Sequence, residues 1–538
     1  MPYFPKHAIA LALAASLTAC SGGGGSSTET NSGSTGSGGG SGTSDITWVK
    51  GQFASEGIYK DFCANPRVQS NDKKGTALYE KMWLRSWTNN TYLWYSEVPD
   101  NDPNSFATVS DYFKQLKTTQ TTASGAQKDR FHGSMSSAEW EALSGSGESL
   151  GYGMEVQILK GDVPRKVVVA YTEPGSEAAT KGMLRGSEII EINGVDVVNA
   201  TGQSAVDALN AGLFPSQKGA VSSFKVKAPD SSERSYSFTA ATVVQQPVQN
   251  VKTLDTASGK VGYMLFNSHI ATSEKALVDA VNQLKAAGVN DLVLDLRYNG
   301  GGLLAIASQL GYMIAGPSRT TNKVFEQTSF NDKHTSINPV TGQTLLPLPF
   351  LTTGVGFSYS EGAALPTLNL GRVFVLTTSG TCSASEAIIN GLRGIDFDVV
   401  QIGNRTCGKP YGFYPTDNCG TTYFTIQFRG ENNKGFGDYA DGFEPSNSPV
   451  LAGESVKGCY LGDDFSHPLG DTNEAMLSAA LSYRETGSCP ALASASFDIP
   501  RVRARDIEQA DSDTLADPRA DEVFRNNRIL TELDGLQR

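Results

Sequence analysis

From residue 260 onward, the chain alternates between short apolar runs and amphipathic segments of helical length. Apolar strands that are separated by helices are joined by long crossover connections, and such strands pair in parallel. The pattern therefore predicts an α/β core that is built from βαβ units. The runs with strand character are residues 261–266, 291–296, 372–378 and 397–403, and the main helical segments are residues 272–288 and 384–392.

Two regions of different character precede this core. Residues 46–145 combine helical signals with many aromatic side chains, and His132 near their end is interpreted as structural. Residues 146–245 contain short β-branched runs, glycine turns and two short helical segments, which is typical of a compact β-rich module. We therefore expect an α+β multidomain chain with an N-terminal helical domain (46–145), a β-rich module (146–245), an α/β core (246–495) and a charged C-terminal tail (496–538).

The first 45 residues predict export and a tether. Residues 1–19 contain an apolar run too short for a permanent bilayer span, which needs about 20 residues, so they are interpreted as a signal peptide. Their Leu-Thr-Ala-Cys ending resembles a bacterial lipobox and implies lipidation at Cys20, with Ser21 favouring the outer membrane. An ordinary signal peptide with an incidental cysteine is the alternative. Residues 20–45 consist mainly of Gly, Ser and Thr, so we expect a flexible linker that is lipid-anchored in the cell envelope and faces the periplasm.

Charge and motif spacing exclude several kinds of partner. The formal net charge of −12 argues against a nucleic-acid partner. Neither a Cys-x-x-Cys nor a His-Glu-x-x-His spacing occurs in the sequence. We therefore expect no metal site.

The cysteines other than Cys20 suggest disulfides, because their number is six and the chain is predicted to be exported. Sequence alone leaves the connectivity open. The candidate arrangement is Cys407 with Cys419 across a hairpin, Cys459 with Cys489 across a C-terminal loop, and Cys382 as a free thiol.

One strand-to-helix junction and one lysine form a pattern typical of acyl transfer. Ser383 lies between the apolar run 372–378 and the helical segment 384–392, where backbone N–H groups converge. Lys409 lies one strand further on, among uncharged neighbours. Burial can lower the pKa of a lysine, ordinarily near 10.4, by up to about 3–5 units. The pair is therefore a candidate nucleophile and general base, with an ordinary surface lysine as the alternative for Lys409.

Donors for an oxyanion are available at two places. The N–H of Ala384 directly follows the candidate nucleophile. Gly300, Gly301 and Gly302 follow the run 291–296, and glycines let the backbone approach a reacting carbonyl without a Cβ clash. If the two strands are neighbours, both donors face one pocket at the strand ends, where α/β sheets place their sites.

The β-rich module resembles a PDZ domain. The resemblance is carried by Pro174-Gly-Ser-Glu-Ala and by Gly186-Ser-Glu-Ile-Ile-Glu-Ile-Asn-Gly194. It implies capture of peptide C-termini by strand addition, with backbone N–H groups binding the terminal carboxylate. The loop at the matching position consists of Leu150, Gly151, Tyr152 and Gly153, and a glycine turn without a ligand is the alternative.

Over residues 125–450, the chain resembles the C-terminal processing peptidases, which are tail-specific Ser/Lys proteases. The resemblance implies that Ser383 is the nucleophile and Lys409 the general base. It also implies an oxyanion hole formed by Gly301 and Ala384, protein or peptide substrates with free C-termini, and no cofactor. The matching motifs are Asp295-Leu-Arg-Tyr-Asn-Gly-Gly-Gly302, Ser383-Ala-Ser-Glu386 and Gly403-Asn-Arg-Thr-Cys-Gly-Lys409.

The chain departs from this family four residues after the lysine. A glutamine is common there in the family, whereas this sequence has Phe413. Gln427 lies on a later strand-like run and cannot be given the glutamine's role from sequence. The residue that orients Lys409 therefore stays open.

Two other functions are open. A Ser/His/Asp hydrolase is suggested by Gly147-Glu-Ser-Leu-Gly151, but this motif precedes a strand instead of joining a strand to a helix. A non-catalytic peptide-binding lipoprotein with a peptidase-like fold is the second, and the presence of Ser383 and Lys409 argues against it. The sequence therefore predicts a serine endopeptidase of the cell envelope whose PDZ-like module recognises substrate C-termini. Its oligomeric state is not predicted.

Overall fold

The structure is a computed structural model that describes residues 46–490, except residues 69, 123, 450 and 451, together with residues 514–515 and 528–529. The predicted signal peptide, Cys20 and the whole linker at 20–45 lie outside the described residues, as does most of the tail at 496–538. Among the helices of the described residues, none is both long enough and apolar enough to cross a membrane.

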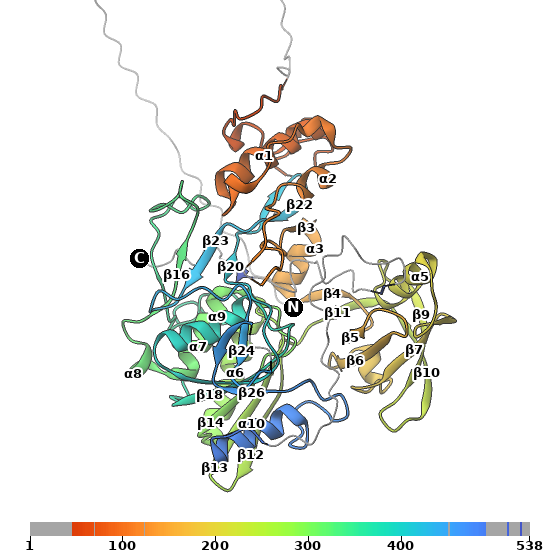
Figure 1. Ribbon diagram of the computed structural model, residues 1–538, viewed down its shortest axis with the longest axis vertical. Coiled ribbons are helices and arrows are strands. Elements are labelled where there is room, and N and C mark those ends of the chain that lie inside the picture. The colour runs from red at the N-terminus through yellow and green to blue at the C-terminus, as the bar shows by residue number, and fades with distance from the viewer. Residues whose placement is uncertain are drawn as a thin grey trace, which may run out of the picture. The chain divides into compact units, whose positions relative to one another are not determined.

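A six-stranded sheet forms the centre of the α/β core (Figure 1). Five of its strands run parallel, and β12 pairs antiparallel at one edge. The helices α6 and α9 connect parallel neighbours, so the predicted βαβ units are confirmed. The strands, in sheet order, are β12 (Val248–Thr256), β13 (Gly259–Phe266), β14 (Asp291–Asp295), β18 (Arg372–Thr377), β19 (Asp398–Gly403) and β26 (Gly458–Tyr460). The helices beside it are α6 (Ser273–Ala287), α7 (Leu304–Ala315), α9 (Ala384–Gly394) and α10 (Ala475–Thr486).

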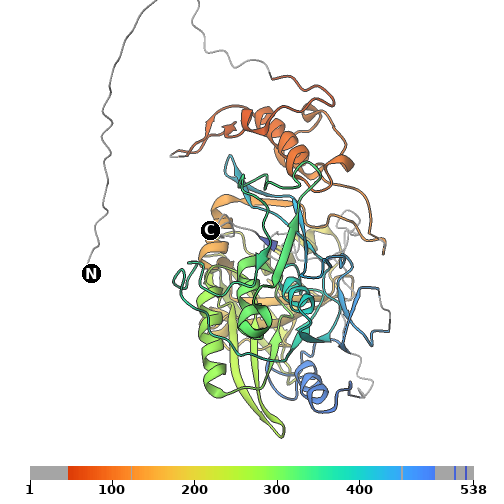
Figure 2. The same cartoon turned by 90° about the vertical axis from the view of Figure 1, so that its left-hand side faces the viewer.

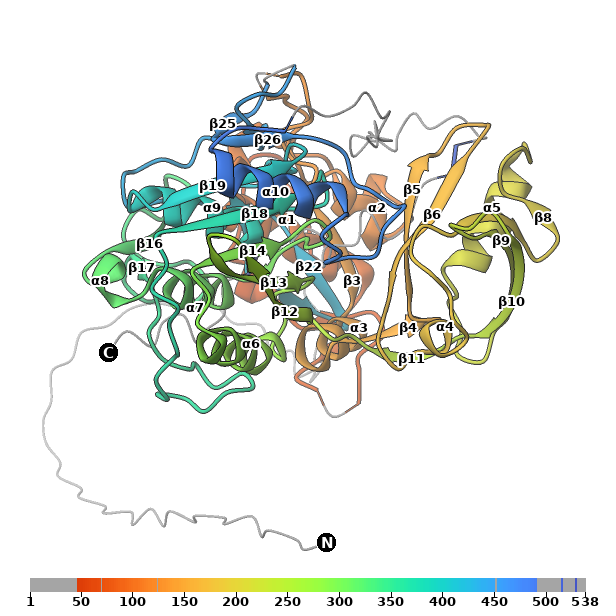
Figure 3. The same ribbon diagram turned by 90° about the horizontal axis from the view of Figure 1, so that it is seen from below.

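Alternate side chains of these strands belong to two different apolar layers. Met264 and Leu294 are part of a cluster with residues of α6, α7 and α9. Their sequence neighbours Leu265 and Val293 are part of a second cluster with residues of α10. Because successive side chains of a strand point to opposite faces, the sheet is buried on both sides, as Figure 3 shows. This explains why its strands read as continuous apolar runs.

The β-rich module is built on a second sheet, which has the order β10–β9–β7–β6–β5 with β8 paired to β7. Its strands enclose an apolar core with α5, and β5 forms one edge of the sheet. The predicted Asn-Gly turn occurs between β7 and β8, with positive φ at Asn193 and Gly194. The elements are β5 (Met154–Lys160), β6 (Lys166–Thr172), α4 (Glu177–Thr180), β7 (Glu188–Ile192), β8 (Val195–Asp196), α5 (Gln203–Leu213), β9 (Val221–Lys227) and β10 (Glu233–Thr239).

The N-terminal helical region is joined to the core by a shared sheet. Strand β3 (Gly133–Ser136) pairs with β22 (Thr421–Phe424) of the α/β region. Trp83 and Trp87 of helix α1 (Ala77–Thr91) stack on each other and pack against the Tyr423 ring of β22. Figure 2 shows α1, in orange, next to blue strands of the α/β region. Trp83 and Trp87 therefore pack against the α/β region, whereas other rings, such as those of Tyr59 and Tyr79, contact each other within the N-terminal region.

Three disulfides correct the predicted connectivity. Cys459–Cys489 is present as expected. The predicted pairing of Cys407 with Cys419 is wrong. Cys419 forms a disulfide with Cys63, and Cys407 forms one with Cys382. Cys382 is therefore not a free thiol. The Cys407 N–H donates to the carbonyl oxygen of Thr381 at 3.0 Å, which brings the two chain segments side by side.

The remaining elements are short and lie mostly in small sheets and connecting turns. They are η1 (Glu56–Ile58), β1 (Phe62–Cys63), β2 (Lys73–Lys74), η2 (Tyr95–Glu97), η3 (Pro103–Ser105), α2 (Val109–Lys114), α3 (Ser137–Glu141), η4 (Ala142–Ser146), β4 (Glu148–Gly151), β11 (Ala241–Val244), β15 (Gly302–Leu303), α8 (Pro317–Thr320), β16 (Val324–Ser329), β17 (Leu348–Pro349), β20 (Tyr411–Gly412), β21 (Thr416–Asn418), β23 (Phe428–Glu431), β24 (Phe443–Pro445), β25 (Glu454–Val456) and β27 (Arg528–Ile529).

Candidate active site

Three loops meet at the ends of three neighbouring strands. The glycine turn 300–302 follows β14, Ser383 follows β18, and Lys409 follows β19. In the sheet, β18 lies between β14 and β19, and all three run parallel. Parallel strands place their C-terminal ends at the same edge, so the three loops lie together. The neighbour relation that the sequence only assumed is thus present.

Ser383 occupies a strained turn at the start of α9. It has φ +60° and ψ −111°, outside the regions that a residue with a Cβ ordinarily adopts. The turn is tied to the loop after β14, because the Asn299 carbonyl oxygen accepts from Cys382 N–H at 3.1 Å and from Ser385 Oγ at 3.0 Å. The Ser383 side chain is buried, and its Oγ has no hydrogen-bond partner among the described residues. Such strain persists only where the surroundings hold it in place.

Glu386 connects the serine turn to the lysine loop. One carboxylate oxygen, Oε2, accepts from the N–H of Ser383 at 2.9 Å and from the N–H of Lys409 at 2.8 Å. The other, Oε1, accepts from Thr406 Oγ1 at 2.5 Å and from Gly408 N–H at 2.8 Å. Burial raises the pKa of Glu386, and these donors act in the opposite direction. Sequence analysis gave Glu386 no role, although a glutamate three residues after a helix-starting serine is a recognisable capping pattern.

Replacement of Glu386 by glutamine should lower kcat about 10²-fold and change KM much less. A glutamine has one carbonyl oxygen, so whichever way its amide is turned, the NH₂ group faces two of the four donors. In one orientation the Ser383 and Lys409 backbones lose their shared acceptor, and in the other the Gly408 N–H loses its acceptor. Steady-state kinetics on a fluorogenic peptide measures the effect, with Glu431→Gln, whose carboxylate pairs with the exposed Arg429, as the matched control. An unchanged kcat in Glu386→Gln would contradict this positioning role.

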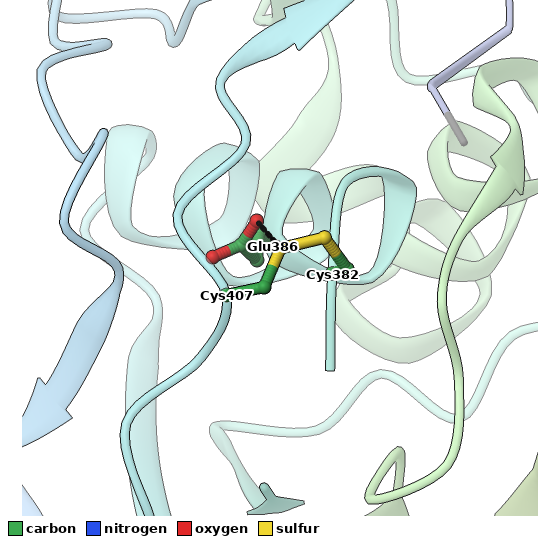
Figure 4. Close-up of side chains that lie close together, drawn as sticks. All are labelled: Cys382, Glu386 and Cys407. Atoms are coloured by element: carbon green, nitrogen blue, oxygen red, sulfur yellow. Dashed lines mark hydrogen bonds between the residues drawn. A yellow bond between two sulfur atoms is a disulfide. The ribbon is translucent and has the colours of Figure 1, made fainter. Parts of the chain in front are cut away.

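A disulfide makes the same connection covalently. Cys382 precedes the serine and Cys407 lies two residues before the lysine, with their Cα atoms 5.1 Å apart. Figure 4 shows this bond beside the Glu386 carboxylate. The two sulfur atoms and the carboxylate lie close enough to suggest a metal site. The two sulfurs are bonded to each other, and both carboxylate oxygens already accept hydrogen bonds from N–H and O–H donors. We therefore assign no metal there.

Lys409 lies in an apolar pocket. Its side chain is fully buried, and its Nζ lies 4.6 Å from the ring centre of Phe131 and 4.8 Å from that of Phe413. Burial lowers the pKa of Lys409 to about 7, while the negative charges of Asp129 and Glu386 act in the opposite direction. A large fraction of the amine is therefore uncharged at neutral pH. The surface-lysine alternative does not fit this environment.

Phe413 occupies the position where the family has a glutamine, and its ring forms one side of the Lys409 pocket. Gln427 does not replace that glutamine: its Oε1 accepts from Tyr414 N–H at 2.7 Å and its Nε2 donates to Thr91 Oγ1 at 3.3 Å. One polar end of its side chain thus binds the residue after Phe413, and the other binds helix α1. Phe131 comes from the N-terminal region, where its N–H donates to Asp129 Oδ1 at 2.9 Å.

The glycine turn is organised by Asn299. Its Oδ1 accepts from Gly301 N–H at 2.9 Å and lies 3.0 Å from Nδ1 of His269. In this conformation the Gly301 N–H is therefore engaged, and its predicted role as an oxyanion donor stays a prediction. Ala384 is the first residue of α9, so its N–H has no acceptor within the helix.

Two histidines lie close to these loops and were not singled out as functional from the sequence. Burial lowers the pKa of His269 to about 3, so its ring is neutral. Its backbone brackets the glycine turn, with its N–H donating to Gly301 O at 3.0 Å and its carbonyl oxygen accepting from Leu303 N–H at 2.8 Å. The position of His269 shortly after β13 could have indicated this neighbourhood. His132 is buried, stacked on Phe113 and hydrogen-bonded at both ring nitrogens, in agreement with a structural role.

The predicted carboxylate-binding loop leads directly into the edge strand β5. Leu150 and Gly151 belong to β4, which pairs with β11, and the serine of the rival Gly-x-Ser-x-Gly motif lies in the same strand. The Tyr152 side chain is buried and its hydroxyl donates to Ser222 Oγ at 2.9 Å. Gly153 has φ +78° and packs against Ser176. Tyr152 and Gly153 can therefore offer a ligand only their backbone groups.

A PDZ-type module in front of an α/β core with a buried serine at a strand-to-helix turn defines the class of PDZ-containing serine-type peptidases. Comparison with known families agrees: the sequence pattern described as peptidase family S41 matches residues 260–414. The peptidase S41 N-terminal domain matches residues 79–131, and the PDZ domain matches residues 143–212. The sequence patterns of peptidase family S41 thus match this chain, and the resemblance seen in its motifs is confirmed.

Two relatives of similar sequence are carboxyl-terminal-processing peptidases. The chain is 29% identical over 269 residues to a carboxyl-terminal-processing protease of Picosynechococcus, covering 50% of this chain and 56% of that protein. It is 23% identical over 249 residues to carboxyl-terminal-processing peptidase 3, chloroplastic, of Arabidopsis thaliana, covering 45% of this chain and 42% of that protein. The matches thus span about half the length of these relatives. A crystal structure of an S41-type protein from Bacteroides fragilis shares the fold, with a TM-score of 0.55 and 24% identity over 76% of this chain and 97% of that one.

Proposed function

We propose that this protein is a serine endopeptidase in which Ser383 is the nucleophile and Lys409 the general base. The observation that supports this most strongly is the shared carboxylate oxygen of Glu386, which holds the backbone N–H groups of both residues. The second support is the apolar pocket that lowers the pKa of Lys409 to about 7. A base with a pKa near the working pH is the most effective proton acceptor.

In the proposed reaction, the neutral Lys409 amine takes the hydroxyl proton as Ser383 Oγ attacks the substrate carbonyl. The oxyanion of the tetrahedral intermediate is stabilised by the Ala384 N–H and by an N–H of the glycine turn, for which Gly301 is our candidate. The Lys409 ammonium then donates its proton to the leaving amine, which gives the acyl-enzyme. Water hydrolyses the ester with Lys409 again acting as base, and the serine is regenerated.

The PDZ module is proposed to select the substrate. Its β5 edge and the preceding loop at Leu150, Gly151, Tyr152 and Gly153 would bind an extended peptide with a free C-terminus by strand addition. From the sequence of residues 1–45, we further propose that Cys20 is lipidated and that the protein works in the cell envelope. The alternative of a non-catalytic peptide-binding protein would retain the PDZ function without cleavage.

The test is cleavage together with active-site labelling. The full-length protein should cut an unstructured peptide with an apolar C-terminus, and a serine-directed fluorophosphonate should form one adduct, located at Ser383 by peptide mass spectrometry. The rate should fall as the pH decreases below about 7, because the amine of Lys409 becomes protonated. Peptide binding without cleavage would favour the non-catalytic alternative. Labelling at another serine would rule out the proposed nucleophile.

A further inference from the structure

The chain's own C-terminal region occupies a position beside the edge of the PDZ sheet. The N–H of Leu515 donates to the carbonyl oxygen of Gly161 at 2.9 Å, and Thr514 Oγ1 donates to Asp162 Oδ1 at 2.6 Å. Gly161 directly follows the edge strand β5, beside which residues 514–515 appear in dark blue in Figure 3. The Leu515 side chain is 1% exposed and belongs to the apolar core of the module. A backbone hydrogen bond plus a buried apolar side chain at a sheet edge is the way PDZ domains hold peptides.

A second part of the same region lies at the catalytic loops. Strand β27 pairs in parallel with β15, Arg528 opposite Gly302 and Ile529 opposite Leu303. β15 is the direct continuation of the glycine turn, and the other neighbour of Gly302 is His269. β27 also lies against β20, which begins two residues after Lys409. An extended chain therefore already pairs with the strand that directly follows the predicted oxyanion donor Gly301.

We propose that residues 514–515 and 528–529 act as an internal peptide ligand that competes with external peptides for the PDZ edge and for the β15 edge. The proposal rests on the proposed peptidase function, since it assigns the occupant of that site. A sheet edge beside apolar side chains can bind an extended peptide, and the backbone bond of Leu515 at the end of β5 together with its buried side chain has this form. The free protein would then bind and cleave substrates only during the time in which this segment is displaced.

The expected size of the effect follows from tethering. A segment of the same chain has an effective concentration on the order of 1 mM at its site. If the segment is bound for about nine-tenths of the time, the apparent Kd of an external peptide is raised about tenfold. Release of the segment should remove this factor without any change in the pocket residues.

Gly161 offers a substitution that acts on the segment and on little else. A Cβ at this position would lie 2.4 Å from Leu515 O and 3.3 Å from Thr514 Cγ2, and its nearest neighbours all belong to the C-terminal region. Its φ is not in the left-handed region, so alanine imposes no backbone strain. Gly161→Ala should therefore displace residues 514–515 from the module. Gly145→Ala is the matched control, because the same change there meets open space.

The second substitution acts at the catalytic loops. Arg528→Pro combined with Ile529→Pro removes both backbone N–H groups of β27 and should prevent its pairing with β15. Arg528→Ala combined with Ile529→Ala changes the same side chains and keeps the backbone donors. The alanine pair is therefore the control for the proline pair.

The experiment uses full-length protein in the Ser383→Ala background, so that no cleavage intervenes. Hydrogen–deuterium exchange of the 300–304 backbone and fluorescence-polarisation titration with a labelled decapeptide ending in an apolar residue are measured for each variant. We expect faster exchange at 302–303 in the proline pair alone, and about a tenfold lower Kd in the proline pair and in Gly161→Ala but in neither control. Unchanged exchange in the proline pair, or an unchanged Kd in both test variants, would overturn the proposal. Neither measurement requires catalysis, so absence of cleavage by the unmodified protein would disprove the proposed peptidase without deciding this result.

Discussion

Replacement of Lys409 by methionine should lower peptide cleavage about 10³-fold or more and at the same time make the folded protein more stable. The loss of activity is expected because methionine fills the same apolar pocket without a proton acceptor. The gain in stability follows from the burial that lowers the pKa of the lysine from 10.5 to about 7. Between these values the unfolded chain holds a proton that the folded chain lacks, so the stability of the unmodified protein rises with pH through this range.

The free-energy cost that folding imposes on the charged form of Lys409 is therefore fully present below pH 7 and disappears above pH 10.5. At pH 7 methionine should raise the free energy of unfolding by an amount on the order of 3 kcal/mol, and the difference should shrink as the pH is raised. Urea unfolding at pH 7 and pH 9.5, combined with a cleavage assay, measures both effects. Lys457→Met, at an exposed lysine paired with Asp398, should change neither quantity. Retained cleavage, or a stability difference that grows with pH, would contradict the assignment of Lys409 as a buried base.

Replacement of Arg297 by methionine is expected to destabilise the fold by about 3–5 kcal/mol. The Arg297 guanidinium is fully buried and bonds three carboxylates, those of Asp295, Asp463 and Glu474, at 2.6–3.1 Å. Removing the cation leaves these carboxylates close together in the interior. Asp463 also pairs with Arg185 of the PDZ module at 2.6 Å, so the same cluster joins the module to the core.

Thermal and urea unfolding of Arg297→Met test this expectation. Arg372→Met is the matched control: this arginine pairs with Asp291 at 2.7 Å, but its side chain is 36% exposed, and its loss should cost about 1 kcal/mol or less. A similar midpoint for both variants would show that the buried cluster contributes no more than a surface pair.

The sequence predicted the layers of the core well, for a physical reason. Strands β13, β14, β18 and β19 are buried on both faces, so most of their positions are apolar and the run stands out against its surroundings. Helix α6 ends at Gly288, which has φ +71°, the conformation for which glycine is favoured. These signals are local, and a single sequence contains them in full.

Contacts between distant segments were not predictable in the same way. Cys407 pairs with Cys382 because β18 and β19 are neighbours in space, whereas sequence spacing pointed to Cys419. Phe131 precedes the PDZ module in the sequence and Lys409 follows it, yet the Phe131 ring lies against the Lys409 amine. No periodicity in the sequence indicates such a contact. Glu386 was visible as a motif residue, but its four donors come from two loops whose proximity depends on the sheet order.

Because the Phe131 ring forms part of the pocket around Lys409, the lowered pKa of the Lys409 amine depends on the completed fold. The family match of the peptidase segment begins at residue 260, and Cys419 of the α/β region is covalently joined to Cys63 far upstream. A chain in which the N-terminal region has not yet docked would leave the Lys409 amine in water, where it is protonated and unable to accept a proton from Ser383. A newly made molecule would thus carry both Ser383 and Lys409 and still be inactive until its N-terminal region had docked on the α/β region.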